Sequence, residues 1–325
     1  MQNISFTKVC LQSEITSSEV IFSVGGVNLK KLSEIVKKAK GFNKIFTVAG
    51  AEDCEVLLAC ESARKEGIGN PILVGIKEKI ETIAKDIGID IKQYEIIDEK
   101  EESEKCKRAV LEVREGRASF VMKGLVSTAT LLKVVLDSEY GIRGDGLLSH
   151  VMVYEIPNYH KLLLLTDGGM NISPTLEEKV QILKNAIKVA KAIEIENPKV
   201  ACLSAVEVIN PKMLSTVEAA KLKEMNQRGK IEGIVDGPLA FDLAISKEAA
   251  IHKGVKSEVA GDADILLVPF IEVGNALGKS FTYFAKARSA GIVVGAKAPI
   301  VLVSRADSHE DKFNSIAFAS IVSAW

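Results

Sequence analysis

The 325-residue sequence has few cysteines, few aromatic residues and almost no net charge. Its five cysteines form no CxxC pair and are odd in number, which disfavours a disulfide framework or a zinc site and favours reduced thiols. Aromatic residues make up 5% of the chain, so platforms on which nucleic-acid bases stack are not expected. With 42 basic and 43 acidic residues the net charge is -1, and no surplus of positive charge attracts nucleic acid or anionic lipid.

Long apolar runs are also missing, since no stretch approaches the roughly 18 residues of a membrane span. The first residues, MQNISFTKVC, lack the basic segment followed by an apolar block that marks a secretion signal. Hydrophobic residues are 47% and charged residues 26% of the chain, as in an ordinary globular protein, and the length is sufficient for two domains. We therefore expect a cytoplasmic globular protein.

Segments of strand and helical character alternate along the first part of the chain. Residues 44–50 and 71–75 are short apolar runs, and each is followed by a segment with helical spacing, 51–67 and 76–88. A further run, 118–122, precedes another helical pattern. Strands without alternation of hydrophobic and polar residues, each followed by a helix, predict a parallel sheet covered on both faces. The predicted fold class is therefore α/β.

The pattern changes after Gly141. Residues 147–169 predict two strands joined by a Pro-Asn-Tyr turn, which indicates an antiparallel pair. Alternation of helix and strand then resumes, so we place a domain boundary between residues 140 and 150. The last predicted strand is introduced by Gly291 to Gly295 and fits either half.

Candidate ligand-binding residues lie in loops that lead from strands into helices, where parallel α/β sheets bind ligands. In MKGLVSTATLLK, Gly124 forms a turn, and Ser127 with Thr128 opens a helix. An N-cap explains these hydroxyl residues, but glycine N–H groups at a helix N-terminus also suit a phosphate, and Lys123 adds positive charge. In TDGGMNISPTLEEK, most residues are explained by a turn and by a helix that has proline at its first position. Neither the turn nor the helix start requires Asn171, which is therefore a candidate for ligand binding.

The segment 268–287 resembles a phosphate-binding P-loop, but only three residues separate Gly274 from Gly278. The nest of N–H groups that holds phosphates depends on loop length, so we reject a nucleoside triphosphatase. A Gly–Asn turn at Asn275 remains, with Lys279 in the first turns of the helix that follows, and this arrangement suits an anion. No GxGxxG follows an early strand, so the dinucleotide-binding fingerprint is missing as well.

The polar stretch SRADSHED, residues 304–311, separates an apolar strand from a helical pattern. Ser308 is predicted to be the N-cap of the helix, and Asp311, at the third helical position, its capping-box partner. Neither role requires Ser304 or Arg305 at the end of the strand, and an arginine there is a natural fork for an anion.

Other catalytic constellations are poorly supported by the sequence. No GxSxG elbow is present, so each histidine is predicted to be a surface or hydrogen-bonded residue rather than a catalytic base. No HExxH motif and no paired Cys/His spacing appears, so no metal site is predicted. The histidines concerned are His150, His160, His252 and His309.

Several motifs together resemble the phosphotransacylase family. VSRADSHEDKFNSIA is similar to the C-terminal signature of that family, in which Ser-Arg is followed, seven positions after the serine, by an aspartate. TDGGMNISPTLEEKVQILKNAI, DGPLAFDLAIS, ADILLVPFIEVGNALGKS and MKGLVSTATLLK look like its other blocks, and the likeness spans residues 42–325. The phosphate butyryltransferase branch is the most similar. Acetyl-type enzymes usually have Leu-Ser-Arg-Gly-Cys where this chain has VSRAD. They also tend to have an arginine near the position where this chain has Tyr283.

The resemblance implies a two-domain, three-layer α/β/α fold like that of isocitrate and isopropylmalate dehydrogenases, with a cleft between the domains. Residues 1–145 and 291–325 would form the first domain and 146–290 the second, through which the chain is expected to form a homodimer or a higher homo-oligomer. The implied reaction is acyl-CoA + phosphate = acyl phosphate + CoA, by direct attack in a ternary complex. Coenzyme A and phosphate are substrates, and no tightly bound cofactor is expected.

The resemblance also implies roles for particular residues. The expected catalytic residues are Ser304, Arg305 and Asp311. A thiol has a reference pKa of ~8.5 and an aspartic acid of ~3.9, so Asp311 is expected to accept the thiol proton only as attack proceeds, while cations stabilise the forming charge. Three alternatives stay open: an acetyl-preferring enzyme, a dehydrogenase of the related fold, and a non-catalytic module that binds CoA or acyl phosphate. The expected substrate-binding residues are Lys123, Gly124, Ser127, Thr128, Asn171, Asn275 and Lys279.

Overall fold

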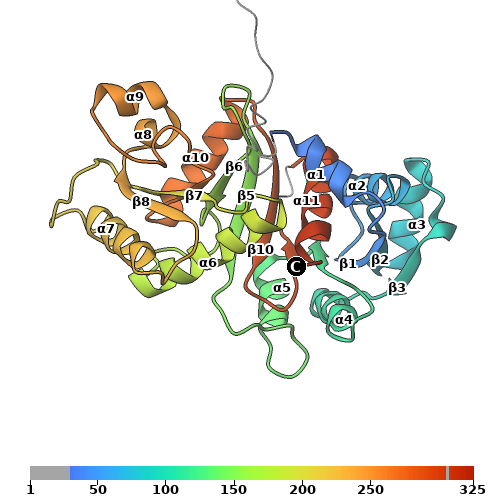
Figure 1. The fold of residues 1–325 in the computed structure, drawn as a ribbon. Coiled ribbons are helices and arrows are strands. Elements are labelled where there is room, and N and C mark those ends of the chain that lie inside the picture. Colours follow the sequence, from blue (N-terminus) through green and yellow to red (C-terminus); the bar gives the residue numbers. More distant parts are fainter. Residues whose placement is uncertain (1–29, 305–306) are drawn as a thin grey trace, which may run out of the picture.

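The computed structural model describes residues 30–304 and 307–325. Within these ranges, 11 strands form one sheet. In Figure 1 the sheet runs across the molecule from β8 on the left to β3 on the right. The strands are β1 (Lys44–Ala49), β2 (Gly69–Gly75), β3 (Glu95–Asp98), β4 (Val121–Lys123), β5 (Ser149–Glu155), β6 (Leu163–Thr166), β7 (Lys199–Leu203), β8 (Ile234–Leu239), β9 (Ile265–Leu267), β10 (Arg288–Val294) and β11 (Ile300–Val301). Their order across the sheet is β3-β2-β1-β4-β11-β10-β5-β6-β9-β7-β8.

Helices follow most of these strands, as the alternating pattern predicts. A short 3-10 helix, η1 (Ile91–Gln93), precedes β3. The α-helices are α1 (Leu32–Ala39), α2 (Cys54–Lys65), α3 (Lys77–Asp86), α4 (Glu102–Arg114), α5 (Thr128–Val135), α6 (Leu176–Ala192), α7 (Leu214–Gln227), α8 (Phe241–Ile245), α9 (Lys247–His252), α10 (Ile271–Tyr283) and α11 (His309–Val322).

The sheet is parallel in both halves and antiparallel in its centre. Strands β3, β2, β1, β4 and β11 are mutually parallel, as are β6, β9, β7 and β8. Between the two sets, β10 is antiparallel to both β11 and β5, and β5 is antiparallel to β6. The predicted α/β class and the predicted antiparallel pair within 147–169 are both confirmed.

Helix α6 begins slightly later than the sequence pattern predicts. Its N-cap is Thr175, whose hydroxyl accepts the N–H of Glu178 while the Glu178 carboxylate accepts the N–H of Thr175. Pro174 therefore precedes the N-cap instead of occupying the first helical position. A reciprocal capping box satisfies two of the free N–H groups at a helix start, which explains why the helix begins there.

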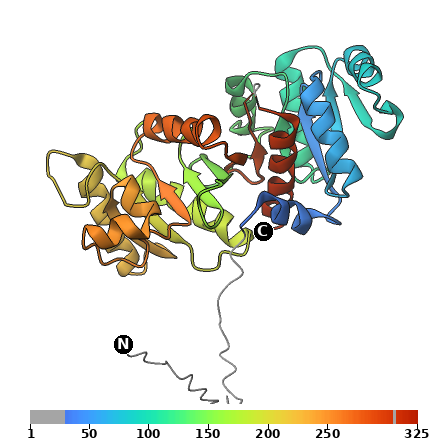
Figure 2. The ribbon, with the colours of Figure 1, turned by 90° about the horizontal axis from the view of Figure 1, so that it is seen from above.

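Helices cover both faces of the sheet, which gives three layers. On one face, a single hydrophobic core extends across the sheet from β2 and β1 to β7 and β8 and includes the inner sides of α1, α2, α6 and α11. The dark red α11 lies beside the blue α1 and α2 in Figure 2. On the opposite face the core is divided into two clusters, one under α4 and α5 and the other under α8 and α10. The positions of the predicted domain boundaries stay a prediction, because the sheet itself is continuous.

The described residues contain no disulfide, and Cys54, Cys60, Cys106 and Cys202 are free thiols. Cys10 lies outside the described ranges. No helix within 30–304 and 307–325 combines the length and the apolar character needed to cross a membrane.

Candidate functional site

The polar stretch at 304–311 follows the end of β11 and leads into α11. The N–H of Ser304 donates to Asp307 Oδ2 at 2.8 Å, and the N–H of Asp307 donates to the Ser304 carbonyl at 3.2 Å, so these residues close a tight turn. Arg305, the predicted anion-binding residue, lies outside the described residues. The amide of His309 donates to Glu55 Oε2 at 2.7 Å, which fastens the start of α11 to the start of α2.

Asp311 is held from two sides. The hydroxyl of Ser308 accepts the N–H of Asp311 at 3.2 Å, which confirms Ser308 as the N-cap of α11. The Asp311 carboxylate reaches back to the Ser308 hydroxyl, which donates to Oδ2 at 2.7 Å, rather than to the backbone N–H of Ser308. Its other oxygen accepts the N–H of Ser289 in β10 at 3.3 Å. The carboxylate therefore joins the helix to a central strand.

A second carboxylate, a phenol and an ammonium gather beside this turn. Burial and the nearby charge of Asp311 raise the pKa of the Asp307 carboxyl, against the lowering effects of the Ser304 N–H, Lys312 and Lys279. Burial and the charge of Asp307 raise the pKa of the Tyr154 phenol in turn. Lys279 in α10 and Tyr154 in β5 therefore both lie close to the Asp307 carboxylate, so α10 and β5 meet at this end of β11.

Two glycines allow α10 to lie this close to its neighbours. A Cβ at Gly278 would lie 2.6 Å from the Tyr154 hydroxyl, and a Cβ at Gly274 would lie 2.6 Å from the Cα of Gly168. Between them, the side-chain N–H of Asn275 points to the Gly168 carbonyl at 3.5 Å. Asn275 and Lys279 are exposed and one helical turn apart, so both predicted residues lie on one side of α10.

Asn171 supports the loop after β6. Its side-chain amide donates to the Leu148 carbonyl at 2.8 Å and to Asp167 Oδ2 at 2.6 Å. Asp167 is buried and also accepts the N–H groups of Gly169 and Met170, so its carboxylate organises the loop. Asn171 is therefore anchored in the described structure, and its predicted contact with substrate would use its remaining oxygen.

The loop after β4 lies beside the loop after β1. The N–H of Gly124 donates to the Ala49 carbonyl at 2.9 Å, the N–H of Leu125 to the Gly50 carbonyl at 2.6 Å, and the N–H of Ser127 to Glu102 Oε1 at 2.8 Å. Lys123 is buried, with its ammonium 3.1 Å from the Gly124 carbonyl. An anion at this turn would have to replace these bonds, and the predicted cradle at Gly124 stays a prediction.

The hydroxyl residues at the start of α5 differ in their contacts. Ser127 is the N-cap, since its hydroxyl accepts the N–H of Thr130 at 3.0 Å. Thr128, the first residue of the helix, is exposed. The capping explanation therefore holds for Ser127, whereas the side chain of Thr128 is exposed and its contact with substrate stays a prediction.

His150 was predicted to be a surface or hydrogen-bonded residue, and the structure corrects that prediction, because it places the residue in the central β5–β10 strand pair. It lies on β5, two residues before Met152 and four before Tyr154, so all three side chains share one face of the strand. Its Nε2 atom is buried with no hydrogen-bond partner in the described part of the chain. Burial lowers the pKa of its imidazole, which the charge of Asp167 partly offsets. In the sequence, His150 and Met152 alternate with the apolar residues Val151 and Val153. This alternation is the signal that could have placed His150 on a strand.

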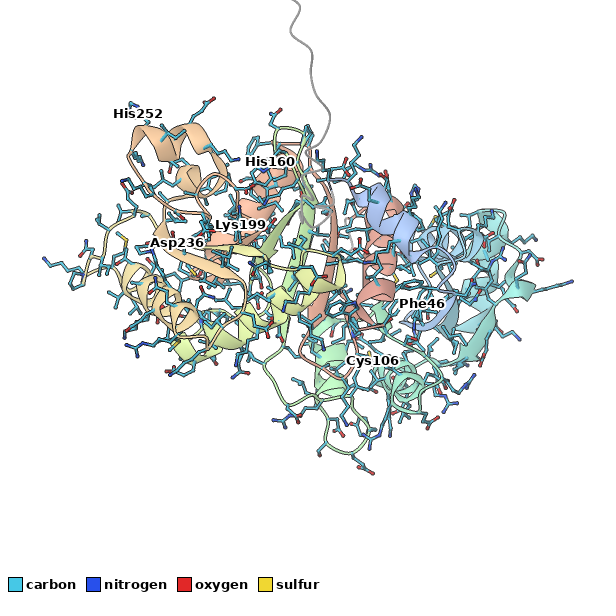
Figure 3. The ribbon with its side chains drawn as sticks, viewed as in Figure 1. Phe46, Cys106, His160, Lys199, Asp236 and His252 are labelled. Carbon is cyan, nitrogen blue, oxygen red and sulfur yellow. The ribbon has the colours of Figure 1, made fainter. Side chains whose placement is uncertain are left out.

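The other histidines fit the surface roles predicted for them. His160 is 2.7 Å from Asp262 Oδ1, and His309 Nδ1 is 3.5 Å from Glu55 Oε2. Figure 3 shows His160 and His252 on the half of the molecule that contains α8 and α9, away from Phe46 and Cys106 in the other half. Within residues 30–304 and 307–325, no group of three His, Cys, Asp or Glu side chains is arranged to hold a metal ion.

The arrangement at the end of β11 suits proton transfer next to developing negative charge. Asp311 and Asp307 can accept protons, and the ammonium of Lys279 can stabilise an oxyanion or a thiolate nearby. The hydroxyl of Ser304, which is exposed, can donate a hydrogen bond to a phosphate or a carbonyl oxygen. These are the functions that an acyl-transfer reaction requires.

Comparison with known proteins agrees with this chemistry. A family model described as "Phosphate acetyl/butaryl transferase" matches residues 31–109 and 102–320. The chain is 51% identical over 296 residues to a phosphate butyryltransferase of Clostridium acetobutylicum, covering 90% of this chain and 98% of that protein. It is 45% identical over 291 residues to a phosphate acetyltransferase of Thermotoga maritima, covering 89% and 99% respectively.

Solved structures agree as well. A branched-chain phosphotransacylase from Enterococcus faecalis superposes with a TM-score of 0.78 at 39% identity, over 86% of this chain and 99% of that one. A 4-hydroxythreonine-4-phosphate dehydrogenase from Klebsiella pneumoniae, at 12% identity and a TM-score of 0.51, covers 86% and 99% and shares the fold alone. The fold is thus the dehydrogenase-like α/β/α architecture that the sequence predicts. Within that class, the chain belongs to the phosphate acetyl/butyryl transferase family.

Proposed function

We propose that this protein transfers a short-chain acyl group, with butyryl favoured, between coenzyme A and inorganic phosphate. The observation that carries the proposal is the family match over residues 31–320, which includes the polar turn at 304–311. The 51% identity to a phosphate butyryltransferase favours butyryl, and the 45% identity to a phosphate acetyltransferase keeps acetyl as the alternative. Coenzyme A and phosphate act as substrates, and the reaction needs no tightly bound cofactor.

In the direction that forms acyl-CoA, the thiol sulfur attacks the acyl carbonyl carbon of the acyl phosphate. A C–S bond forms, the C–O bond to phosphate breaks, and the thiol proton passes to a carboxylate, which we assign to Asp311. An aspartate is a weak base for a thiol, so the transfer occurs as negative charge moves from sulfur to the carbonyl oxygen. Arg305 and Lys279 stabilise that charge, and Ser304 hydrogen-bonds the phosphate or the carbonyl.

Thiol release from butyryl-CoA and acetyl-CoA in the presence of phosphate tests the proposal. Arg305→Ala is expected to remove ~2–4 kcal/mol of transition-state stabilisation, and Asp311→Asn is expected to lower kcat strongly. Arg228→Ala is the matched control, because Arg228 is an exposed residue at the C-cap of α7 that pairs with Glu224. Near-normal turnover in both site variants would refute the assigned roles.

The acyl preference requires the ratio of kcat/KM for the two acyl-CoA substrates. A pocket discriminates by about 1–3 kcal/mol per methylene, so a butyryl enzyme should prefer butyryl-CoA by at least about tenfold. A ratio that favours acetyl-CoA would establish the acetyl-preferring alternative. Binding of CoA without any thiol release would instead establish a non-catalytic binding module.

We also propose that the protein forms a homodimer or a higher homo-oligomer and acts in the cytoplasm. Apolar side chains are exposed along and just after α10, with Phe284 87%, Tyr283 64% and Val273 40% exposed. Large apolar side chains exposed in this way support association between subunits. Light scattering coupled to size-exclusion chromatography measures the mass directly, and a monomer at micromolar concentration would refute the oligomer.

A further inference from the structure

The proposed reaction requires a proton transfer at two places. In the direction that forms acyl-CoA, the thiol loses a proton as its sulfur attacks, and the departing phosphate gains one. Without that second proton, an acyl phosphate dianion has to expel a phosphate trianion, which is a strong base and therefore a poor leaving group. Asp311 is assigned to the first transfer only, so the second transfer requires another group.

Two carboxylates stand at the turn 304–311, and their oxygens are occupied to different extents. Both oxygens of Asp311 accept hydrogen bonds, Oδ2 from the Ser308 hydroxyl at 2.7 Å and Oδ1 from the Ser289 N–H at 3.3 Å. Asp307 Oδ2 accepts the N–H of Ser304 at 2.8 Å. Within residues 30–304 and 307–325, Asp307 Oδ1 accepts no hydrogen bond and is not enclosed. A proton on this oxygen can therefore reach a bound ligand.

The surroundings of Asp307 favour its protonated form. The residue is half-buried, and burial together with the charge of Asp311 raises the pKa of its carboxyl. Two carboxylates that interact in this way bind one proton more readily than an isolated aspartate does. In such a pair, the carboxyl with the raised pKa is the natural proton donor and its neighbour the natural acceptor. The charged and titratable groups that face Asp307 are Asp311 and Lys312 in α11, Lys279 in α10 and Tyr154 in β5.

The turn also places Asp307 beside the residue expected to meet the phosphate. Its carboxylate is joined to the backbone of Ser304, whose exposed hydroxyl is available to a phosphate or carbonyl oxygen. We propose that Asp307 is a second catalytic residue, which donates a proton to the departing phosphate, and that Asp307 and Asp311 share one proton. This inference rests on the proposed function and assigns the proton transfer that the proposed function leaves open.

The proton count closes in both directions. As the C–S bond forms, the thiol proton passes to Asp311, and as the C–O bond breaks, the proton of Asp307 passes to the phosphate oxygen. Transfer of a proton from Asp311 to Asp307 then restores the pair. In the reverse direction, Asp307 accepts the proton of the attacking phosphate while Asp311 returns one to the leaving thiolate.

Two acyl donors separate this role from a structural one. Butyryl methyl phosphate leaves as a phosphate monoester dianion, whose conjugate acid has a pKa of about 6, so its departure needs no added proton. In Asp307→Asn, kcat/KM measured by loss of the CoA thiol should fall about hundredfold with butyryl phosphate and less than about threefold with the methyl ester. The asparagine oxygen can still accept the Ser304 N–H, so the turn is preserved.

Two further variants provide the comparison. Asp311→Asn should lower kcat/KM for both donors by similar factors, because the attacking thiol is the same. Glu310→Gln is the matched control, since it removes a carboxylate from the same stretch, is exposed and pairs with Arg288, and it should leave both rates unchanged. Equal losses on the two donors in Asp307→Asn, or no loss on either, would overturn the inference.

The pH profile with butyryl phosphate alone gives a second measurement, which also decides the question if the unmodified protein does not use the methyl ester. A pair that has to carry one proton gives a bell-shaped profile of kcat/KM, and Asp307→Asn should lose the alkaline limb. An alkaline limb that persists in Asp307→Asn would contradict the role of Asp307. If the unmodified protein transfers no acyl group from an acyl phosphate to CoA, the proposed function fails and this role with it, whereas turnover with equal losses overturns the role of Asp307 alone.

Discussion

Gly124 provides the sharpest test of how the loops at the edge of the sheet are built. A Cβ at this position would lie 2.0 Å from the Gly50 carbonyl oxygen and 2.8 Å from its carbon. Ordinary contacts begin near 3.4 Å, so in Gly124→Ala the two loops must separate by roughly 1.4 Å. Overpacking costs about 1–3 kcal/mol, and here the obstacle is backbone, so we expect a loss of about 3 kcal/mol in the free energy of unfolding.

Urea unfolding measures this loss, with Gly146→Ala as the matched control. The nearest atom to a Cβ at Gly146 is Gln181 Oε1 at 3.8 Å, which is an ordinary contact. If Gly124→Ala and Gly146→Ala are equally stable to within about 0.5 kcal/mol, the packing explanation for Gly124 is wrong. A loss of phosphate affinity without a loss of stability would then favour the phosphate cradle that the sequence suggests.

Two further predictions concern stability. Burial opposes ionisation of Glu61, but hydrogen bonds from Arg64 and Tyr94 outweigh it and lower the pKa of this carboxyl to about 2. Because the folded pKa lies below the unfolded value, the stabilisation is present above about pH 4.5 and is lost as the pH falls towards 2. The stability difference between Glu61→Gln and the unmodified protein should therefore shrink from about 2–3 kcal/mol at pH 6 to near zero at pH 2, and a constant difference across urea titrations would contradict this. Ser308→Ala should cost about 1 kcal/mol in urea unfolding through loss of the cap of α11, and no change would mean that Asp311 alone holds the helix start.

The fold was largely predictable because its strands and helices have clear periodicities. The apolar runs at 44–50 and 71–75 contain β1 and most of β2, and the segment after Gly141 gave the antiparallel pair. The position of β11 was not predictable from local pattern, since the strand has only two residues and pairs with β4, which is far away in the sequence. Periodicity indicates which face of a strand is buried, but it does not indicate which strand lies beside it.

The site was predictable only in part. Ser308 and Ser127 were identified as caps because a hydroxyl before a helix has a local cause. Asp307 and Tyr154 were not selected, because their proximity comes from the pairing of β10 with β5 and from two close approaches of α10. His150 was predicted to be a surface or hydrogen-bonded residue because no motif accompanies it, yet it lies on a central strand and its Nε2 has no partner among the described residues. Residues whose roles arise from strand order or helix approach leave no signal in local spacing.

The antiparallel centre of the sheet changes how the predicted residues relate to one another. Parallel strands that all point one way would bring their carboxyl ends to one edge, and the predicted residues would form one cluster. Here β11 and β6 point in opposite directions, so Asp311 contacts Ser289 at one end of the β5–β10 pair, whereas Asn171 contacts Leu148 at the other. At about 3.3 Å per residue, the six steps along the strand from Leu148 to Tyr154 separate the two ends by roughly 20 Å. Helix α10 lies near both, since Asn275 points to the loop after β6 and Gly278 touches Tyr154. A phosphate ion alone can contact only one end of the β5–β10 pair. A long substrate such as an acyl-CoA can contact residues at both ends.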